Sequence, residues 1–175
     1  MKNFINMNRK LLWILVSVAL ILTSCNRDVK QFTGNYSYKL SGEVSIVGED
    51  GNLSYRLVHK NGQMNILEDK SQANRLIITM NEMNGGCYSI PATVKGDSIV
   101  ILPYEFSTNI LISESNPDLF SGDNTLSIVY AIRASGGGQL NDDILMIDEQ
   151  WTGHQSGNDT VLLNGPKMKI IAERN

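Results

Sequence analysis

Hydrophobic and polar side chains alternate along residues 36–46. Even-numbered positions carry tyrosine, leucine, valine, isoleucine or glycine, and odd-numbered positions carry serine, lysine or glutamate. Because successive side chains of a strand point to opposite faces, this period of two predicts a strand with one face buried and one in water. Gly42 lies on the apolar face, which favours a bend or bulge within a long strand.

The following apolar row predicts a second strand of the same kind. Leu53, Tyr55 and Leu57 alternate with polar residues, so we expect all three on a buried face. Asn61-Gly62 then offers the two positive-φ residues of a type I′ hairpin, and another apolar row comes after it. The pattern therefore predicts that the chain reverses direction at Asn61-Gly62.

The remainder of the chain continues in short strands separated by polar or glycine-rich segments. Further strands are predicted near residues 75–80, 88–94, 97–104, 109–113, 125–133, 144–151, 160–163 and 167–173. Lys95-Gly96-Asp97 predicts a tight turn, and the glycine-rich segments 136–143 and 153–159 predict loops. Because no segment after residue 25 sustains a helical period of 3.6, the sequence predicts an all-β, antiparallel domain.

Strands joined by hairpins can close on themselves or form two stacked sheets. The number of predicted strands suits an up-and-down barrel of about eight to ten strands. A two-sheet β-sandwich is the alternative. A long first strand with a glycine in its middle favours the barrel, because closure curls the sheet and removes its exposed edges.

The first residues form an export signal. Lys2, Arg9 and Lys10 precede the apolar run 11–22, and small residues follow. This run is shorter than the roughly 20 apolar residues that a transmembrane helix needs. We therefore expect the segment to be removed.

The signal ends in Leu22-Thr23-Ser24-Cys25, which resembles the lipobox of bacterial lipoproteins. The resemblance implies cleavage between Ser24 and Cys25, diacylglycerol on the Cys25 sulfur and acylation of the new amino terminus. Two or three acyl chains suffice for stable anchoring to a membrane. The alternative is an ordinary secretory signal that happens to contain a cysteine.

Cleavage would divide the chain into a signal (residues 1–24), a lipidated amino terminus and tether (25–33) and one domain (34–175). The signal holds three of the fifteen basic residues and none of the eighteen acidic ones, so twelve basic residues remain and the net charge becomes −6. An acidic domain without a basic patch argues against a nucleic-acid partner. Because the residues just after Cys25 lack the early aspartate that often retains lipoproteins in the inner membrane, we expect the outer membrane, on its periplasmic or cell-surface face.

The domain resembles lipocalin-like, or calycin-like, β-barrel lipoproteins of Gram-negative anaerobes. Three features carry the resemblance: Phe32-Thr33-Gly34-Asn35-Tyr36 within about ten residues of the lipobox, the meander of short strands, and a final strand that ends at Arg174. Lipocalins open with Gly-x-Trp and place an arginine late in the barrel, over that tryptophan. Tyr36 stands where the tryptophan would be, and Arg174 is the candidate arginine. The resemblance implies a barrel that holds a small apolar or amphipathic ligand in its mouth.

Aromatic residues on the predicted inner faces are the candidate pocket lining: Tyr36, Tyr38, Tyr55 and Trp151. The alternative is that these side chains simply fill the core. Asp97-Ser98-Ile99 and Asp159-Thr160-Val161 resemble acceptor sites for O-glycosylation in exported proteins, which makes Ser98 and Thr160 candidate glycosylation sites.

Catalytic motifs are absent from the sequence, and no metal or cofactor site is predicted. His59 and His154 have no partner at ligand spacing, and the neighbours Asp148 and Glu149 should point to opposite faces of a strand. The sequence therefore predicts a lipid-anchored binding, accessory or scaffolding module of the cell envelope. Its predicted partners are the membrane, a small ligand or an envelope protein complex. The alternative is an envelope hydrolase that uses loop carboxylates and His154.

Overall fold

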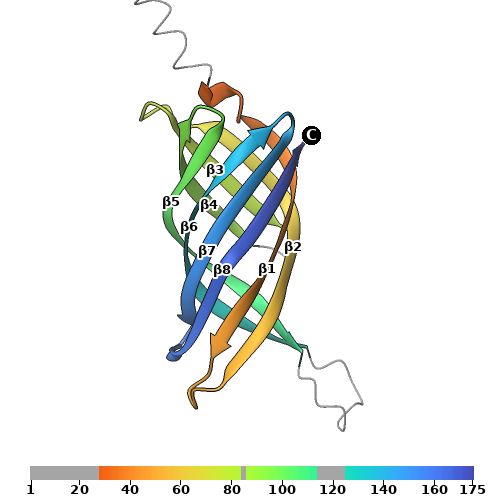
Figure 1. Cartoon of the computed structure of the whole chain (residues 1–175), viewed down its shortest axis with the longest axis vertical. Helices are drawn as coiled ribbons and strands as arrows, with labels where there is room; N and C mark the ends of the chain where they lie inside the picture. Colours follow the sequence, from red (N-terminus) through yellow and green to blue (C-terminus); the bar gives the residue numbers. More distant parts are fainter. Residues whose placement is uncertain (1–27, 84–85, 114–124) are drawn as a thin grey trace, which may run out of the picture.

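Eight antiparallel strands close into one barrel (Figure 1). The computed structural model describes residues 28–83, 86–113 and 125–175. The strands are β1 (Gly34–Val47), β2 (Leu53–Glu68), β3 (Arg75–Glu82), β4 (Cys87–Lys95), β5 (Ser98–Ser113), β6 (Thr125–Asn141), β7 (Ile144–Gln155) and β8 (Asn158–Arg174). Each strand pairs with the next one, and β8 pairs with β1. The predicted up-and-down barrel is confirmed, and the β-sandwich alternative is wrong.

The alternation in β1 sets which side chains fill the barrel. Tyr36, Tyr38, Leu40, Val44 and Ile46 are buried inside, while the serine, lysine and glutamate positions between them face outward. The pairing of β1 with β8 shifts register between Glu43 and Ser45, next to Gly42, so the predicted irregularity is present. Within the described residues, no helix combines the length and the apolar character needed to cross a bilayer.

The predicted hairpin at Asn61-Gly62 is wrong, because β2 runs through it without interruption. A Cβ atom at Gly62 would collide with the carbonyl oxygen of Asn81 and lie 2.9 Å from the ring of Tyr38. Glycine is therefore needed here for close packing between neighbouring strands and not for a turn. The continuous strand points its even-numbered residues inward, so Tyr55 faces outward.

Two more glycine-rich segments that the sequence assigns to loops belong to strands. Residues 136–138 lie within β6, and Gly153 lies within β7. A Cβ atom at Gly136 would collide with the backbone carbonyl of Asp148 on the neighbouring strand, which explains the small residue in a paired position. By contrast, the tight turn at Lys95-Gly96-Asp97 is confirmed, with Gly96 at a φ of 61°.

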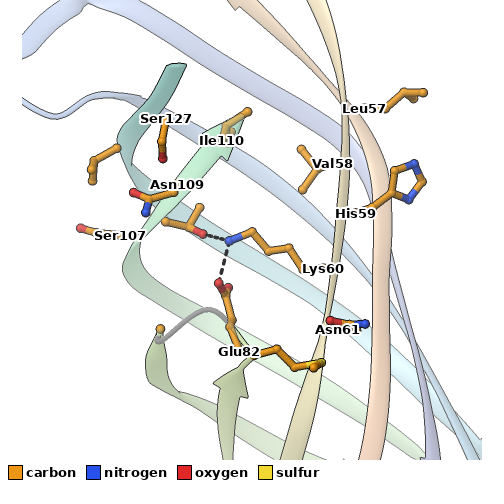
Figure 2. Close-up of a pocket in the computed structure, with 14 residues that line it drawn as sticks. Leu57, Val58, His59, Lys60, Asn61, Glu82, Ser107, Asn109, Ile110 and Ser127 are labelled. Carbon is orange, nitrogen blue, oxygen red and sulfur yellow. Dashed lines mark hydrogen bonds and ion pairs between the residues drawn. The ribbon is translucent and has the colours of Figure 1, made fainter. Parts of the chain in front are cut away.

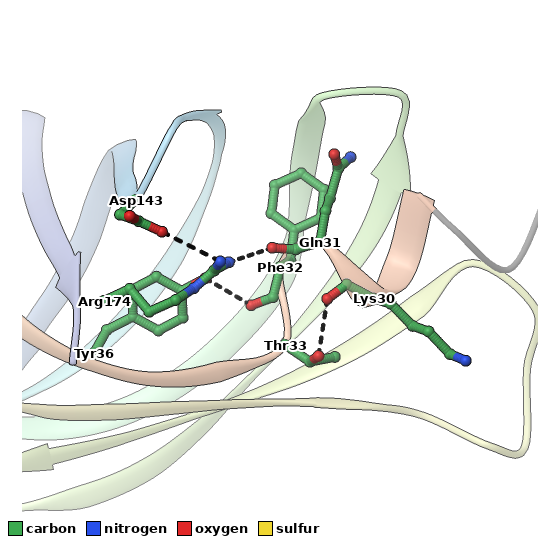
Figure 3. A network of polar contacts seen from close by, with 7 residues as sticks. All are labelled: Lys30, Gln31, Phe32, Thr33, Tyr36, Asp143 and Arg174. Atoms are coloured by element: carbon green, nitrogen blue, oxygen red, sulfur yellow. Dashed lines mark hydrogen bonds and ion pairs between the residues drawn. The ribbon is translucent and has the colours of Figure 1, made fainter.

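The end of the barrel that holds both described chain ends is closed by residues 28–33 (Figures 1 and 3). Val29 and Phe32 are buried in the core, and the carbonyl oxygen of Phe32 accepts a 2.9 Å hydrogen bond from the Tyr36 hydroxyl. The Arg174 guanidinium lies over the Tyr36 ring, 5.3 Å from its centroid, and donates to the Tyr36 hydroxyl at 2.7 Å. Arg174 also donates to the carbonyl oxygen of Gln31. The position of Arg174 over the Tyr36 ring agrees with the arrangement that the resemblance to lipocalins implies. This end of the barrel, however, is filled by the protein's own side chains.

Candidate functional site

A side opening lies between β2 and β5, because the β3–β4 hairpin is too short to separate these strands along their whole length. β3 pairs with β2 only from Gly62 onward, and the pairing of β4 with β5 ends at Ile101. Residues 53–60 of β2 and 103–110 of β5 therefore border a gap in which the described chain places no strand. We use the name side opening for this gap.

Aromatic side chains close the gap between β4 and the middle of β5. Tyr88 of β4 stacks on Phe106 of β5 with ring centroids 4.5 Å apart, and Phe106 stacks on Tyr104 at 5.4 Å. Trp151 of β7 meets Phe106 edge-on at 5.2 Å. These four residues are the aromatic wall. Packing of rings thus replaces the backbone hydrogen bonds that would otherwise join β4 to β5 at this level.

Below the aromatic wall, the side opening holds a pocket of about 600 Å³ (Figure 2). Its centre is a polar cluster of three side chains, in which the Lys60 Nζ lies 2.7 Å from the Glu82 carboxylate and also donates to the Thr108 hydroxyl. Only 13% of the Lys60 side chain and 11% of the Glu82 side chain are exposed. The rim includes further polar and apolar residues: Leu57, His59, Asn61, Ser107, Asn109 and Val129.

Two buried polar atoms behind the side opening have no hydrogen-bond partner among the described residues: the Tyr38 hydroxyl and the Arg56 Nε. The Tyr38 ring lies against Gly62, and its side chain is almost wholly buried. Burial raises the pKa of the Tyr38 hydroxyl, and the negative charge of nearby Glu82 raises it further. The hydroxyl therefore stays protonated and can donate a hydrogen bond. An unpaired buried hydroxyl costs free energy, which a bound polar group would recover.

A second polar group, the Glu149 carboxylate, lies behind the aromatic wall. It is buried and accepts hydrogen bonds from the Tyr104 hydroxyl at 3.0 Å and the Trp151 Nε1 at 3.0 Å. Burial raises the pKa of Glu149, although the hydrogen bonds from Trp151 and Tyr104 act in the opposite direction. Asp148, by contrast, is exposed, as the strand alternation predicts.

The candidate pocket residues of the sequence analysis fall in three different places. Tyr36 belongs to the closed end, Tyr38 lies behind the side opening, and Trp151 is fully buried in the aromatic wall. Tyr55 is wrong as an inner residue, since 57% of it is exposed on the outside of β2. The error follows from the predicted hairpin at Asn61-Gly62, which treated residues 53–60 as a separate strand. In the continuous strand the even-numbered residues face inward, so Leu53, Tyr55 and Leu57 all face outward.

The remaining candidate residues lie away from the side opening or outside the described residues. His154 lies on the surface, 3.4 Å from Asp159, which is the only described carboxylate within ion-pair distance of it. Thr160 is exposed and Ser98 is partly exposed, and both stay predicted glycosylation sites. Ser24 and Cys25 lie outside the described residues. Among the residues that are described, no group of three metal-binding side chains is gathered.

Four residues of the site were not among the sequence-predicted site residues: Lys60, Glu82, Thr108 and Glu149, of which only Glu149 was considered, as the neighbour that faces away from Asp148. Glu149 carries a readable signal, because it interrupts the buried row Leu145, Ile147 and Trp151 of one strand. Lys60 is an even-numbered residue of β2, so it belongs to the row that faces inward once β2 is recognised as continuous through Gly62. Glu82 and Thr108 lie 22 and 48 residues from Lys60, so only strand pairing brings these side chains together.

Comparisons with known proteins give a distant similarity to a solved structure and no family. No protein-family model matches the chain, and a search of curated proteins found no relative. A solved structure described as "Structure of EF1p2_mFAP2b bound to DFHBI" is similar with a TM-score of 0.45 and 13% sequence identity, over 86% of this chain and 99% of that chain. The fold assignment above rests on the strand pairing of this chain itself.

Proposed function

We propose that this chain is a lipid-anchored binding module of the cell envelope that holds its partner at the side opening. Residues 22–25 support the anchor, through their resemblance to a lipobox. The binding role is supported by one observation above all. The side opening has a pocket of about 600 Å³ that is lined by Glu82, and near Glu82 lies the buried hydroxyl of Tyr38, which has no hydrogen-bond partner in the described chain.

The side opening supports binding better than the mouth does. The mouth near the chain ends is filled by Phe32 and covered by Arg174, so a ligand there would have to displace packed core residues. The pocket of the side opening instead combines apolar walls from Val58 and Ile110 with a polar cluster centred on Lys60. Mixed apolar walls with a few placed polar groups are typical of ligand sites.

The binding role can be tested by native mass spectrometry of the full chain after incubation with envelope extract. We expect a discrete added mass that is lost in Asn109→Trp, because Asn109 is an exposed residue of the pocket rim and an indole there would obstruct the entrance. Lys39→Trp places the same side chain on the exposed outer face of β1 and should keep the added mass. An unmodified mass in the wild-type chain, or equal retention in both variants, would contradict binding at the side opening.

The lipid anchor is tested separately by Cys25→Ala. The wild-type chain should sediment with membranes, and its amino-terminal peptide should carry the mass of diacylglycerol on Cys25. The variant should lose this mass and leave the membrane fraction, because no thiol remains at the position where the acyl chains are attached. Cys87→Ala removes the other cysteine and is the matched control, which should stay with the membranes. Unchanged fractionation of Cys25→Ala would show that the chain is not anchored in this way.

A further inference from the structure

One edge of β2 has no described strand beside it along the side opening. β1 pairs with residues 53–66 on one side of β2, but β3 pairs only from Gly62 onward on the other. A free strand edge presents a row of backbone N–H and C=O groups, which is a template for another strand. Proteins usually shield such an edge by a neighbouring element or by charge. Two charged side chains of β2 lie close to this edge: Lys60 is directed inward and paired with Glu82 (Figure 2), and Arg56 donates a hydrogen bond to the Tyr55 carbonyl.

The direction of the backbone groups on this edge can be assigned from one hydrogen bond. The carbonyl oxygen of Asn61 accepts a 3.1 Å bond from the Met83 N–H, so the polar groups of Asn61 point toward β3. Because β2 pairs with β1 in unbroken register, the backbone N–H and C=O groups of alternate residues point the same way. The backbone groups of His59, Leu57 and Tyr55 therefore face the side opening. The Tyr55 carbonyl accepts a bond from its neighbour Arg56. The peptide groups of Leu57 and His59 therefore form the free part of the edge, as far as the described chain extends.

Apolar side chains lie on both faces of this free edge, beside polar rim residues such as His59 and Asn61. On the outside, 68% of Leu57 is exposed, and Val129 on the opposite rim is also exposed. On the inside, Val58 and Ile110 are buried walls of the same pocket. A strand added to this edge would alternate its own side chains between these two surfaces. The charges of Lys60 and Glu82 neutralise each other, whereas Arg56 has no ion-pair partner among the described residues, so the surroundings disfavour a strand with basic side chains.

We propose that the partner at the side opening is an extended peptide segment without basic residues and with apolar residues at alternate positions. It adds to β2 as a strand, and its backbone hydrogen-bonds with Leu57 and His59. The proposal rests on the proposed function, in that it takes the side opening as the binding site. Backbone pairing supplies affinity in this mode of recognition, and the flanking side-chain surfaces select the sequence. A compact small molecule has no row of donors and acceptors at strand spacing to match this edge.

The test selects binders from a phage-displayed library of random linear dodecapeptides on the immobilised full chain, and measures affinities of the synthesised peptides. His59→Pro removes the N–H that faces the side opening and leaves the pairing with β1 intact, because that N–H points away from β1. His59→Ala keeps the N–H and is the matched control. We expect peptides with alternating apolar residues, and we expect His59→Pro to bind them at least tenfold more weakly than His59→Ala, since both variants lack the imidazole and only the alanine variant keeps the N–H.

Amide hydrogen exchange of the wild-type chain gives a second readout, which holds even if His59→Pro fails to fold. Bound peptide should slow hydrogen exchange at the backbone amides of Leu57 and His59, while exchange at the backbone amides of β6 stays unchanged. Equal binding to all three chains, or no slowing at these two amides, would overturn strand addition. A library that enriches no peptide, while envelope extract still supplies a mass lost in Asn109→Trp, would overturn the peptide and keep the proposed function. A dimer that forms with rising concentration and is abolished by His59→Pro would overturn the peptide as the partner, because a second copy of this chain would then occupy the edge.

Discussion

Trp151→Ala is expected to lower the free energy of unfolding by about 3–5 kcal/mol, the cost of removing a large side chain from a packed core. Trp151 is fully buried, meets the Phe106 ring edge-on at 5.2 Å and donates a hydrogen bond to Glu149. The substitution would leave a cavity behind the aromatic wall and take one donor from a buried carboxylate. Because Trp151 is the only tryptophan after residue 25, unfolding in urea should be followed by far-UV circular dichroism and not by fluorescence.

The matched control for Trp151→Ala is Ile144→Ala at the start of the same strand. Ile144 is an exposed apolar residue of β7, so its truncation should change the free energy of unfolding by less than about 0.5 kcal/mol. If Trp151→Ala cost no more than Ile144→Ala, the aromatic wall would not be a packed part of the barrel.

Relative to the wild type, Glu149→Gln should have a higher free energy of unfolding at pH 8 than at pH 4, by about 1–3 kcal/mol. The reason is that the ionised carboxylate of the wild-type protein is buried. The pKa of Glu149 is raised by burial above its value in the unfolded chain. Between these two pKa values the folded protein binds more protons than the unfolded one, so the stability of the wild-type protein falls as pH rises through this range. Glutamine removes the charge and keeps the shape, so this part of the pH dependence disappears.

The measurement is a series of urea unfolding curves between pH 4 and pH 8 for the wild type, Glu149→Gln and Asp148→Asn. Asp148 is the exposed neighbour on the same strand, and its variant should follow the wild-type pH profile within about 0.5 kcal/mol. Taking the difference between the two pH values cancels any constant cost of fitting the glutamine amide. Parallel curves for wild type and Glu149→Gln would mean that Glu149 has the same pKa in both states.

Local patterns predicted the type of structure well and its boundaries less well. The period of two in residues 36–46 identified β1 and its inner face, because burial of alternate residues is a property of the strand alone. Asn61-Gly62 misled the prediction, because the same dipeptide suits a tight turn and a close contact between strands. Only Tyr38 and Asn81, which pack against Gly62 from neighbouring strands, decide between the two.

The sequence by itself determined an all-β meander, the turn at Gly96, the opposite facing of Asp148 and Glu149, and the pairing of Arg174 with Tyr36 that the family resemblance implied. The tertiary structure alone decided the closure of the mouth by Phe32 and the position of the side opening. It also brought Lys60, Glu82 and Thr108 together from three strands. The reason is that alternation records which face of a strand is buried, whereas strand register and relative length decide which residues meet across the barrel.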